Sequence, residues 1–472
     1  MPPKLVLFAC VLFIVFVFWV ERRRNAQVSS ALFWPLLWYL VAASRPVGAW
    51  LLIWGVPLPG SVDPTEGSIV DRWFYSILGL IGILILARRR CNWAAILKEN
   101  AWLLTLFGFM AMSILWSDYP LVSLRRDVKS LCAAVMVLVV LTEPKPLEAI
   151  TAVLRRGAYF LIPLSIVTIR YFRDIGISWD WAGNAVFWQG VATAKNTLGQ
   201  VAMTSALCFL GERIRRPSKE GRMIDFLYLL MSLYLLKGSD DAVSMTSLSV
   251  FAVGLFFFLR LQFLKLRPHR VKMFCLLSCV LIFGVLLTLI WHTLNPFSEN
   301  SFMGVIIRTM GRDMTLTGRT EIWSDVFKVA SRSPVIGVGY GAFWIGRLAN
   351  IPWSENLTWA LGQAHNGYVD TYLQLGWVGV GLLTAVILSS IRKIVRSFPI
   401  DFEYGRFRMT FFLVILFVNI TESTFLRGDH NMWFLFLLAA LSVPYANERS
   451  VGSAEEKGNG PLVTAARPGS QG

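Results

Sequence analysis

Long apolar blocks are the feature that most constrains how this chain can fold. Each block is roughly 15 to 22 residues long, enough for a helix to cross the hydrocarbon core of a bilayer. Such a block must be helical inside lipid, because no water is present there to satisfy its backbone groups. Only 16% of the residues are charged, whereas soluble domains carry about a quarter. The sequence therefore predicts an all-α, polytopic membrane protein.

Thirteen segments are predicted as membrane spans. They are 4–20, 31–43, 72–87, 100–115, 128–141, 157–171, 196–210, 223–236, 245–260, 272–291, 367–390, 408–421 and 431–446. Basic clusters such as Arg88–Arg90 follow an odd-numbered span or precede an even-numbered one, so the positive-inside rule places all of them in the cytoplasm. The N-terminus is then outside and the C-terminus inside. Because the first span can be an addition to a 12-span core, we expect 12 or 13 spans.

The spans and the polar segments between them divide the chain into five regions. These are an N-terminal extra span with its basic cytoplasmic stop (1–30), an N-terminal membrane helical core (31–291), a large outer loop (292–366), C-terminal membrane helices (367–446) and a disordered cytoplasmic tail (447–472). No small-residue cleavage site follows the first span, so we expect it not to be a cleaved signal peptide. The outer loop is the only long one, and loops of this size are often functional.

Two stretches of the outer loop have a recognisable pattern. Ile322, Val326 and Val329 recur at helical spacing, which predicts an amphipathic helix lying on the membrane surface. The glycines at 337, 339 and 341 are not a dinucleotide-binding fingerprint, because no strand precedes them. They are typical of a turn or of a close approach between two backbones.

The charge and cysteine patterns argue against several kinds of partner. The net charge is +16, but the basic residues stand in short clusters between apolar blocks, not on one contiguous face. We therefore expect no nucleic acid as a partner. The six cysteines lack metal-ligand spacing, and no Asp-x-Asp pair stands at an outer span end. The sequence thus predicts neither a metal nor another cofactor.

His365 and Arg319 are the first candidates for chemistry. His365 lies where the outer loop re-enters the membrane, and a neutral histidine there can take a proton from an attacking hydroxyl. The alternative is a histidine that bonds a loop carbonyl. Arg319 opens the predicted amphipathic helix, where an arginine can bind phosphate through two hydrogen bonds. Its alternative is an interfacial arginine that contacts lipid phosphate.

Other candidates share a position at the outer ends of predicted spans. Arg125 and Arg126, in the outer loop 116–127, depart from the positive-inside bias. An anionic ligand would explain them, and so would outer-leaflet phosphates or pairing with Asp127. The same face receives Lys195, Asn196, Lys237 and Glu422.

A set of motifs follows in order over most of residues 70–445. It comprises Lys195-Asn196 with Gly199, Gly318-Arg319 with Trp323, Pro334 through Phe343 with the three glycines, Ala364-His365-Asn366 with Tyr368, and Leu375-Gly376 with Gly379. The set resembles the O-antigen ligase and polysaccharide polymerase superfamily of bacterial inner membranes. Trp116-Ser117 with Pro120, Leu124, Arg125 and Arg126, and the phrase Leu316-Thr317-Gly318-Arg319, resemble the branch involved in exopolysaccharide production.

The resemblance implies a GT-C-like glycosyltransferase architecture with a large periplasmic loop, in the inner membrane, with the active site facing the periplasm. It also implies a metal-independent, inverting transfer of a glycan from undecaprenyl pyrophosphate. By motif, His365 activates the acceptor hydroxyl and Arg319 holds the pyrophosphate. The substrate-binding set is then Arg125, Arg126, Lys195, Asn196, Lys237, Asn366, Tyr368 and Glu422. Many members place an arginine after the span that matches 223–236, whereas this chain has Lys237-Gly-Ser-Asp-Asp.

Three functions remain open at this point. Polymerisation of exopolysaccharide repeats is favoured over O-antigen ligation to lipid A-core, on the branch-like phrases alone. A transporter or flippase is the alternative of another class, although transporters tend to place ionisable residues near the bilayer midplane. A scaffold component without catalysis is the third. The expected partners are the lipid-linked oligosaccharide, membrane lipids, and polysaccharide export or chain-length proteins.

Overall fold

The computed structural model describes residues 2–24, 29–58, 68–179, 186–215, 222–239, 244, 248, 319–345 and 362–444. The predicted span 245–260 apart from residue 248, the predicted span 272–291, much of the outer loop 292–366 and the tail 447–472 lie outside these residues. Everything that follows concerns the described ranges.

Helices make up nearly all of the regular structure. In chain order they are α1 (Pro3–Arg24), η1 (Ser30–Leu32), α2 (Phe33–Ala42), α3 (Val47–Ile53), α4 (Ile69–Arg88), α5 (Trp93–Glu99), α6 (Ala101–Met112), η2 (Ser113–Trp116), α7 (Pro120–Leu141), α8 (Pro146–Tyr171), α9 (Arg173–Gly176), α10 (Lys195–Arg215), α11 (Arg222–Ser239), α15 (Arg319–Ala330), α16 (Gly367–Ser397), α17 (Phe402–Val418) and α18 (Asn431–Ala440). Strands β1 (Ile177–Trp179) and β2 (Val186–Trp188) form an antiparallel pair in which Ile177 faces Trp188.

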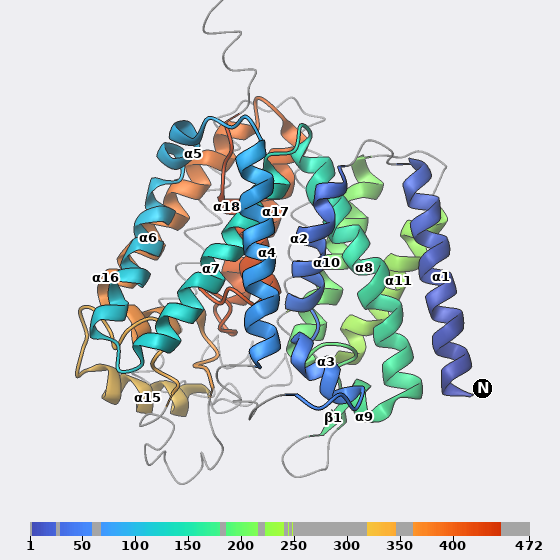
Figure 1. The fold of residues 1–472 in the computed structure, drawn as a ribbon, viewed down its shortest axis with the longest axis horizontal. Helices are drawn as coiled ribbons and strands as arrows, with labels where there is room; N and C mark the ends of the chain where they lie inside the picture. The colour runs from blue at the N-terminus through green and yellow to red at the C-terminus, as the bar shows by residue number, and fades with distance from the viewer. Residues whose placement is uncertain are drawn as a thin grey trace, which may run out of the picture.

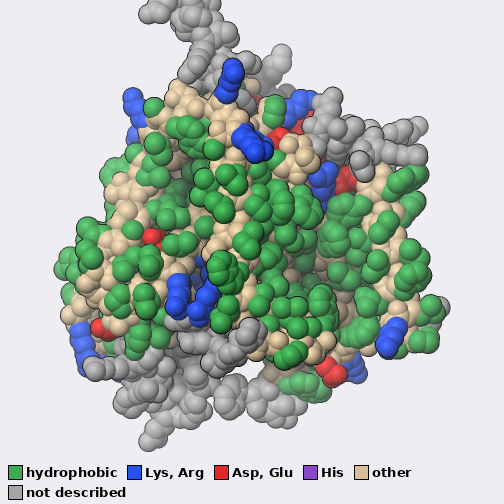
Figure 2. All heavy atoms as spheres, viewed as in Figure 1, with side chains coloured by type: hydrophobic (Ala, Val, Ile, Leu, Met, Phe, Trp, Pro, Cys, Tyr) green, Lys and Arg blue, Asp and Glu red, His purple; other side chains and the backbone are tan. Residues whose placement is uncertain are grey.

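Four of the described helices are long and apolar enough to cross a membrane: α1, α4, α8 and α16. Two bent pairs reach the same length, α2 with α3 at 64° and α5 with α6 at 81°. The long helices stand side by side in Figure 1, and Figure 2 shows mostly hydrophobic side chains on the face in view. The prediction of an all-α, polytopic membrane protein is confirmed. The total of 12 or 13 spans stays a prediction.

The two ends of the bundle differ. In Figure 1, α5 lies at one end, while α15, α9 and β1 lie at the other. The first is named the basic end, because Arg88–Arg90 stand between α4 and α5. The second is named the loop end, because residues 331–345 and 362–366 lie beside α15 there.

Two helices begin earlier than their predicted spans. The structure begins α7 at Pro120 and α8 at Pro146, where the sequence predicts spans from 128 and 157. Proline is favoured at the first helical position, since its fixed φ suits a helix and its missing N–H costs nothing there. The prediction of an outer loop at 116–127 is therefore wrong from residue 120 onward. Arg125 and Arg126 stand on a helix.

The last predicted span, 431–446, is also corrected. The structure ends α18 at Ala440, and all ten residues of this helix are buried. Arg408 of α17 supplies the reason, because it donates to Ala439 O at 2.8 Å and to Leu441 O at 3.0 Å. These bonds satisfy carbonyls at the helix end. Pro444 follows and disfavours a further helical turn.

The predicted amphipathic helix is α15, but its apolar face contacts protein. Trp323, Val326 and Ala330 are buried in one cluster with Phe343 and Leu373. Figure 1 shows α15 lying across the loop end of the bundle. The helix is thus confirmed, and the expectation that its apolar face rests on the membrane surface is wrong for these residues.

The glycine run after α15 packs against a break in α16. Gly337, Gly339 and Gly341 all have positive φ, and so does Gly376 within α16. A Cβ on Gly337 would stand 2.3 Å from Gln374 O, and one on Gly376 2.3 Å from the Val335 backbone. Gly339 N donates to Gln374 O at 3.0 Å. The predicted close approach of two backbones is confirmed, and it packs residues 335–339 directly against the break in α16.

Candidate active site

The segment that carries His365 leads directly into α16. Asn366 caps this helix, since its Oδ1 accepts from the N–H groups of Tyr368 and Val369 at 3.0 Å each. Its Nδ2 donates to Ile420 O at 2.9 Å, which ties the cap to the loop between α17 and α18. His365 itself has φ 51°, a left-handed backbone conformation that is uncommon outside glycine. Such outliers cluster at functional sites.

The His365 ring contacts two polar side chains, one from a neighbouring residue and one from the loop after α17. Its Nδ1 lies 3.7 Å from Oε2 of Glu422 and 3.3 Å from Nε2 of Gln363. The other Glu422 oxygen, Oε1, accepts from Nδ2 of Asn196 at 2.7 Å. Glu422 therefore connects the start of α10 to the histidine.

A cavity of about 600 Å³ opens beside this segment. Five cationic and three acidic side chains line it: Arg72, Arg125, Arg126, Lys129 and Arg427, with Asp71, Asp370 and Asp429. Figure 2 shows a group of Lys and Arg side chains low on the visible face, surrounded by hydrophobic ones. The cavity wall is therefore positively charged next to an apolar surface.

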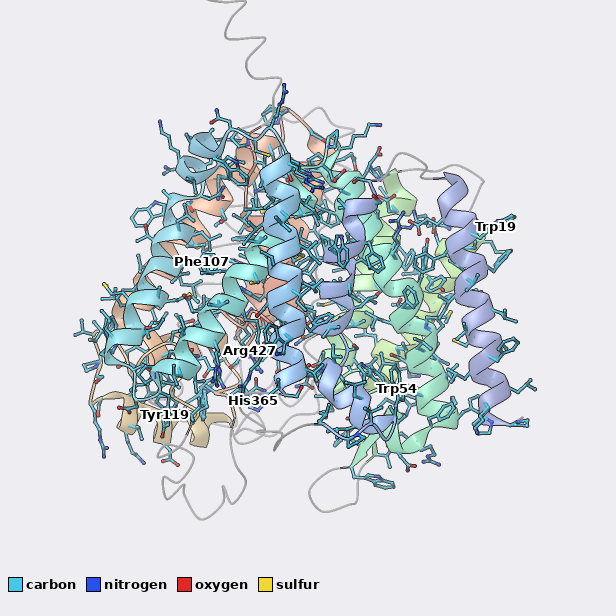
Figure 3. The ribbon with its side chains drawn as sticks, viewed as in Figure 1. Trp19, Trp54, Phe107, Tyr119, His365 and Arg427 are labelled. Carbon is cyan, nitrogen blue, oxygen red and sulfur yellow. The ribbon has the colours of Figure 1, made fainter. Side chains whose placement is uncertain are left out.

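Arg427 connects the cavity to His365. It lines the cavity, and its Nη1 donates to Gln363 Oε1 at 2.9 Å. The amide of Gln363 in turn contacts the His365 ring. Figure 3 shows Arg427 and His365 close together at the loop end of the bundle. The charged cavity and the histidine thus form one site.

Other side chains of the cavity wall are engaged by protein groups. Asp71 accepts from Gly48 N and Ser68 N, both at 3.1 Å. Asp370 Oδ1 accepts from Trp344 Nε1 at 2.8 Å. In the described part of the chain, no three His, Cys, Asp or Glu side chains gather as metal ligands would. The acids of the wall therefore act mainly within the fold.

The loop 427–430 holds a neutral histidine among charged residues. Burial raises the pKa of Asp429, but the charges of Lys129 and Arg427 outweigh it and hold that pKa well below its ordinary value. Burial, followed by the charge of Arg427, lowers the pKa of His430 to about 3. Neutral His430 accepts from Met432 N at 3.2 Å and so caps α18. His430 is therefore part of the scaffold.

The structure brings five of the predicted site residues to this site. His365, Glu422 and Asn196 form the contacts described above, while Arg125 and Arg126 line the cavity. Nη1 of Arg126 also donates to Gly341 O at 2.6 Å. The glycine run is thereby connected to the cavity wall.

Three other predicted residues stand elsewhere or are only partly described. Lys195 begins α10, and its Nζ lies 3.6 Å from the ring centroid of Phe187. Lys237 stands in the last turn of α11 and does not line the cavity. Arg319 is the first residue of α15, and its side chain lies outside the described part of the structure.

Asn366 and Tyr368 serve the fold in this structure. Asn366 is 1% exposed, and its side chain makes the helix cap. The Tyr368 hydroxyl donates to Leu416 O at 3.1 Å, and its ring meets Phe425 edge-on. These contacts join the start of α16 to α17 and the loop beyond it.

Three cations of the cavity wall were missed from the sequence: Arg72, Lys129 and Arg427. Arg72 and Lys129 fall inside predicted spans, and Arg427 lies in the short loop before α18. The signal that pointed to Arg125 and Arg126, a cation on the face that should hold few, applies equally to all three.

Residues 227–384 match the family model described as O-antigen ligase. The match includes α15, the glycine run, His365 and the break in α16. The resemblance to the O-antigen ligase and polysaccharide polymerase superfamily is confirmed.

Two curated relatives place the chain more finely within this superfamily. The exopolysaccharide production protein ExoQ of Rhizobium meliloti is 25% identical over 299 residues, which cover 61% of this chain and 64% of that protein. The ComP-specific O-oligosaccharyltransferase of Acinetobacter baylyi is 28% identical over 141 residues, which cover 30% of this chain and 24% of that protein. The chain thus spans less than two thirds of the length of either relative. The resemblance to the exopolysaccharide branch of the superfamily is also confirmed.

Proposed function

We propose that this protein transfers an oligosaccharide from undecaprenyl pyrophosphate to a sugar hydroxyl at the periplasmic face of the inner membrane. The observation that carries the proposal is the cationic cavity joined to His365 through Arg427 and Gln363. A diphosphate leaving group is anionic, and a histidine can accept the proton of the acceptor. The cationic cavity and His365 at the loop end support both parts of the proposal.

The cavity wall is suited to a diphosphate. Arginine and lysine bind phosphate oxygens through charge-assisted hydrogen bonds, which are roughly twice as strong as neutral ones. Fixed cations beside a largely apolar wall also stabilise charge as it develops, more than water does. Because these cations supply the stabilisation that a metal ion would otherwise give, the transfer is proposed to be metal-independent. The prenyl chain of the donor would lie in the adjoining lipid.

His365 is proposed as the general base. Both ring contacts seen in the described part of the chain use Nδ1. We propose the neutral tautomer that carries its hydrogen on Nδ1, directed toward the Glu422 carboxylate, so that Nε2 has the lone pair that accepts a proton. The hydroxyl oxygen bonds to the anomeric carbon of the donor while its proton passes to Nε2. The bond from that carbon to the diphosphate breaks, and its electron pair leaves with the diphosphate. A single displacement of this kind inverts the anomeric configuration.

Glu422 and Arg319 complete the proposed mechanism. The Glu422 carboxylate, 3.7 Å from Nδ1, compensates the positive charge that the ring gains with the proton. Asn196 fixes that carboxylate by donating to its other oxygen. Arg319, at the start of α15, is proposed to bind the diphosphate in two-point fashion.

His365→Ala in a reconstituted transfer assay tests the proposal. Loss of a general base lowers rates by about 10²–10⁴-fold, and we expect a loss in that range. His430→Asn is the matched control, because asparagine keeps the helix cap and His430 lies outside the reaction. A transporter or scaffold would leave polymer length and yield unchanged in His365→Ala cells, and that result would refute the catalytic role.

Polymerisation of exopolysaccharide repeats is the favoured form of this transfer, because a relative is an exopolysaccharide production protein. The other form is ligation to a distinct acceptor, and the O-oligosaccharyltransferase relative supports it. Lipid-linked intermediates from a deletion strain distinguish the two. Single repeats on the lipid indicate a polymerase, whereas full-length polymer on the lipid indicates a ligase.

A further inference from the structure

The residue before His365, Ala364, is held by buried side chains at both its N–H and its C=O. Ala364 N donates to Asp370 Oδ1 at 3.2 Å, and Ala364 O accepts from Trp323 Nε1 at 2.8 Å. Ala364 is 0% exposed, and the indole that reaches it is 2% exposed. Bonds this deeply buried are costly to break, because no water replaces the lost partner.

The chain after His365 is held in the same manner. Asn366 N donates to Ser423 Oγ at 3.0 Å, and Gly367 N donates to Asn419 O at 2.9 Å. Both acceptors belong to the segment after α17, and both residues are buried. His365 therefore lies between two anchored peptides. This arrangement maintains its left-handed φ of 51°, which a free loop would relax.

Trp323 differs from the other anchors because it stands on α15. The indole bond therefore fixes the rotation and height of α15 against the segment that carries His365. Without it, the apolar cluster of Trp323, Val326 and Phe343 could keep α15 in place while the helix turns or slides.

We propose that Trp323 is a positioning residue, which holds His365 in its left-handed conformation. Asp370 and Ser423 complete this clamp from α16 and from the loop after α17. The inference rests on the proposed function, and it adds that the base is aligned by one buried indole.

Trp323→Phe tests the inference, since it keeps the ring and removes the N–H. Trp433→Phe is the matched control, because its buried indole N–H has no partner in the described part of the chain. We expect Trp323→Phe to lower kcat about tenfold, with KM for the lipid-linked donor within about twofold, because a misplaced base affects the transition state more than binding. Trp433→Phe should keep the kcat of the wild type. Equal kcat in the two variants would overturn the inference.

A double variant separates positioning from a general loss of stability. Trp323→Phe combined with His365→Ala should be no slower than His365→Ala alone, because an absent base cannot be misplaced. A further tenfold loss in the double variant would contradict positioning of the base. If Trp323→Phe fails to accumulate, Ser423→Ala replaces it, with the same expected fall in kcat at unchanged KM; wild-type kcat in Ser423→Ala would then refute the clamp.

The same measurements distinguish the two proposals. If His365→Ala retains full transfer, the proposed function fails, whatever Trp323→Phe does. If His365→Ala loses transfer while Trp323→Phe matches Trp433→Phe, the function stands and the positioning role is wrong.

Discussion

The basic end and the loop end of the bundle handle their cations in different ways. At the basic end, arginines meet carboxylates: Arg155 lies 2.7 Å from Asp225 and 3.8 Å from Glu212, and Arg156 lies 3.4 Å from Glu21. At the loop end, Arg427 donates to the neutral oxygens of Gln363 and Ser423. Arg155 and Arg156 are thus paired with carboxylates, whereas Arg427 bonds to neutral oxygens, and Lys129 beside it pairs with Asp429 at 2.9 Å.

Backbone conformation shows the same contrast. Among the described residues other than glycine, positive φ occurs at His365 and Leu426, and both stand at the loop end. Unfavourable backbone persists only where its surroundings over-determine it. The ion pairs of Arg155 and Arg156 and the ordinary backbone indicate a structural role for the basic end. The loop end places five cationic side chains and strained backbone at or beside one cavity, which is what a binding and catalytic site requires.

Arg319→Lys is the variant with the largest expected effect on this comparison. Lysine keeps the charge but cannot form the planar two-point contact with phosphate oxygens. We expect transfer to fall about 10²-fold or more, the scale seen when one oxyanion donor is removed. Initial rates in proteoliposomes measure it. Near-normal turnover would mean that charge alone suffices at the loop end.

Arg427→Gln removes charge from the cavity wall while keeping a hydrogen-bond donor toward Gln363. We expect transfer to fall by roughly 10- to 100-fold, with a higher KM for the lipid-linked donor, because one charge-assisted bond to phosphate is lost. The midpoint of thermal unfolding in detergent should hardly change. A large drop in that midpoint with normal kcat and KM would show that Arg427 belongs to the scaffold.

Arg155→Leu applies the opposite test at the basic end. Removing one partner of a buried ion pair leaves an uncompensated carboxylate, and such changes cost about 3–5 kcal/mol. We expect lower thermal stability and less protein in the membrane, but a rate per folded molecule within about twofold of the wild type. A specific loss of turnover in fully folded Arg155→Leu would break the division between the two ends.

His430→Asn is expected to have the smallest effect of the four variants. It should change only how thermal stability depends on pH. The pKa of His430 is lowered to about 3 in the folded protein, so the unfolded chain binds more protons below about pH 6.5 and wild-type stability falls with acidification. Protonation of this histidine in the unfolded chain lowers the free energy of unfolding by at most about 2 kcal/mol between pH 7 and pH 5. Thermal unfolding of the variant should be less pH-dependent over that interval. Equal slopes would place a charged histidine in the folded state.

Much of the fold followed from local pattern. Apolar block length predicted the helices, the spacing of Val326 and its neighbours predicted α15, and the glycine run predicted a close backbone contact. Helix ends were less predictable, because they depend on tertiary partners. The end of α18 is set by Arg408 of α17, and no local property of residues 431–446 contains that information.

The site was predicted in pieces that only the fold could join. His365, Asn196 and Glu422 were each candidates, but Asn196 and Glu422 are 226 residues apart in the chain, and their 2.7 Å contact depends on how α10 meets the loop after α17. Lys129 was hidden by its helix, which begins before the apolar block. Arg427 could have been found by applying the positive-inside rule to the short loop before α18.

The central claim is that the cationic side chains of the cavity at the loop end hold a lipid diphosphate. Binding of undecaprenyl pyrophosphate to the purified protein tests it most directly. The wild type should bind this lipid at least about tenfold more tightly than undecaprenyl monophosphate, a difference of about 1.4 kcal/mol. Arg427→Gln should lose most of that preference, and folded Arg155→Leu should keep it. Equal affinity of the wild type for the two lipids, or an equal loss of preference in both variants, would contradict the account.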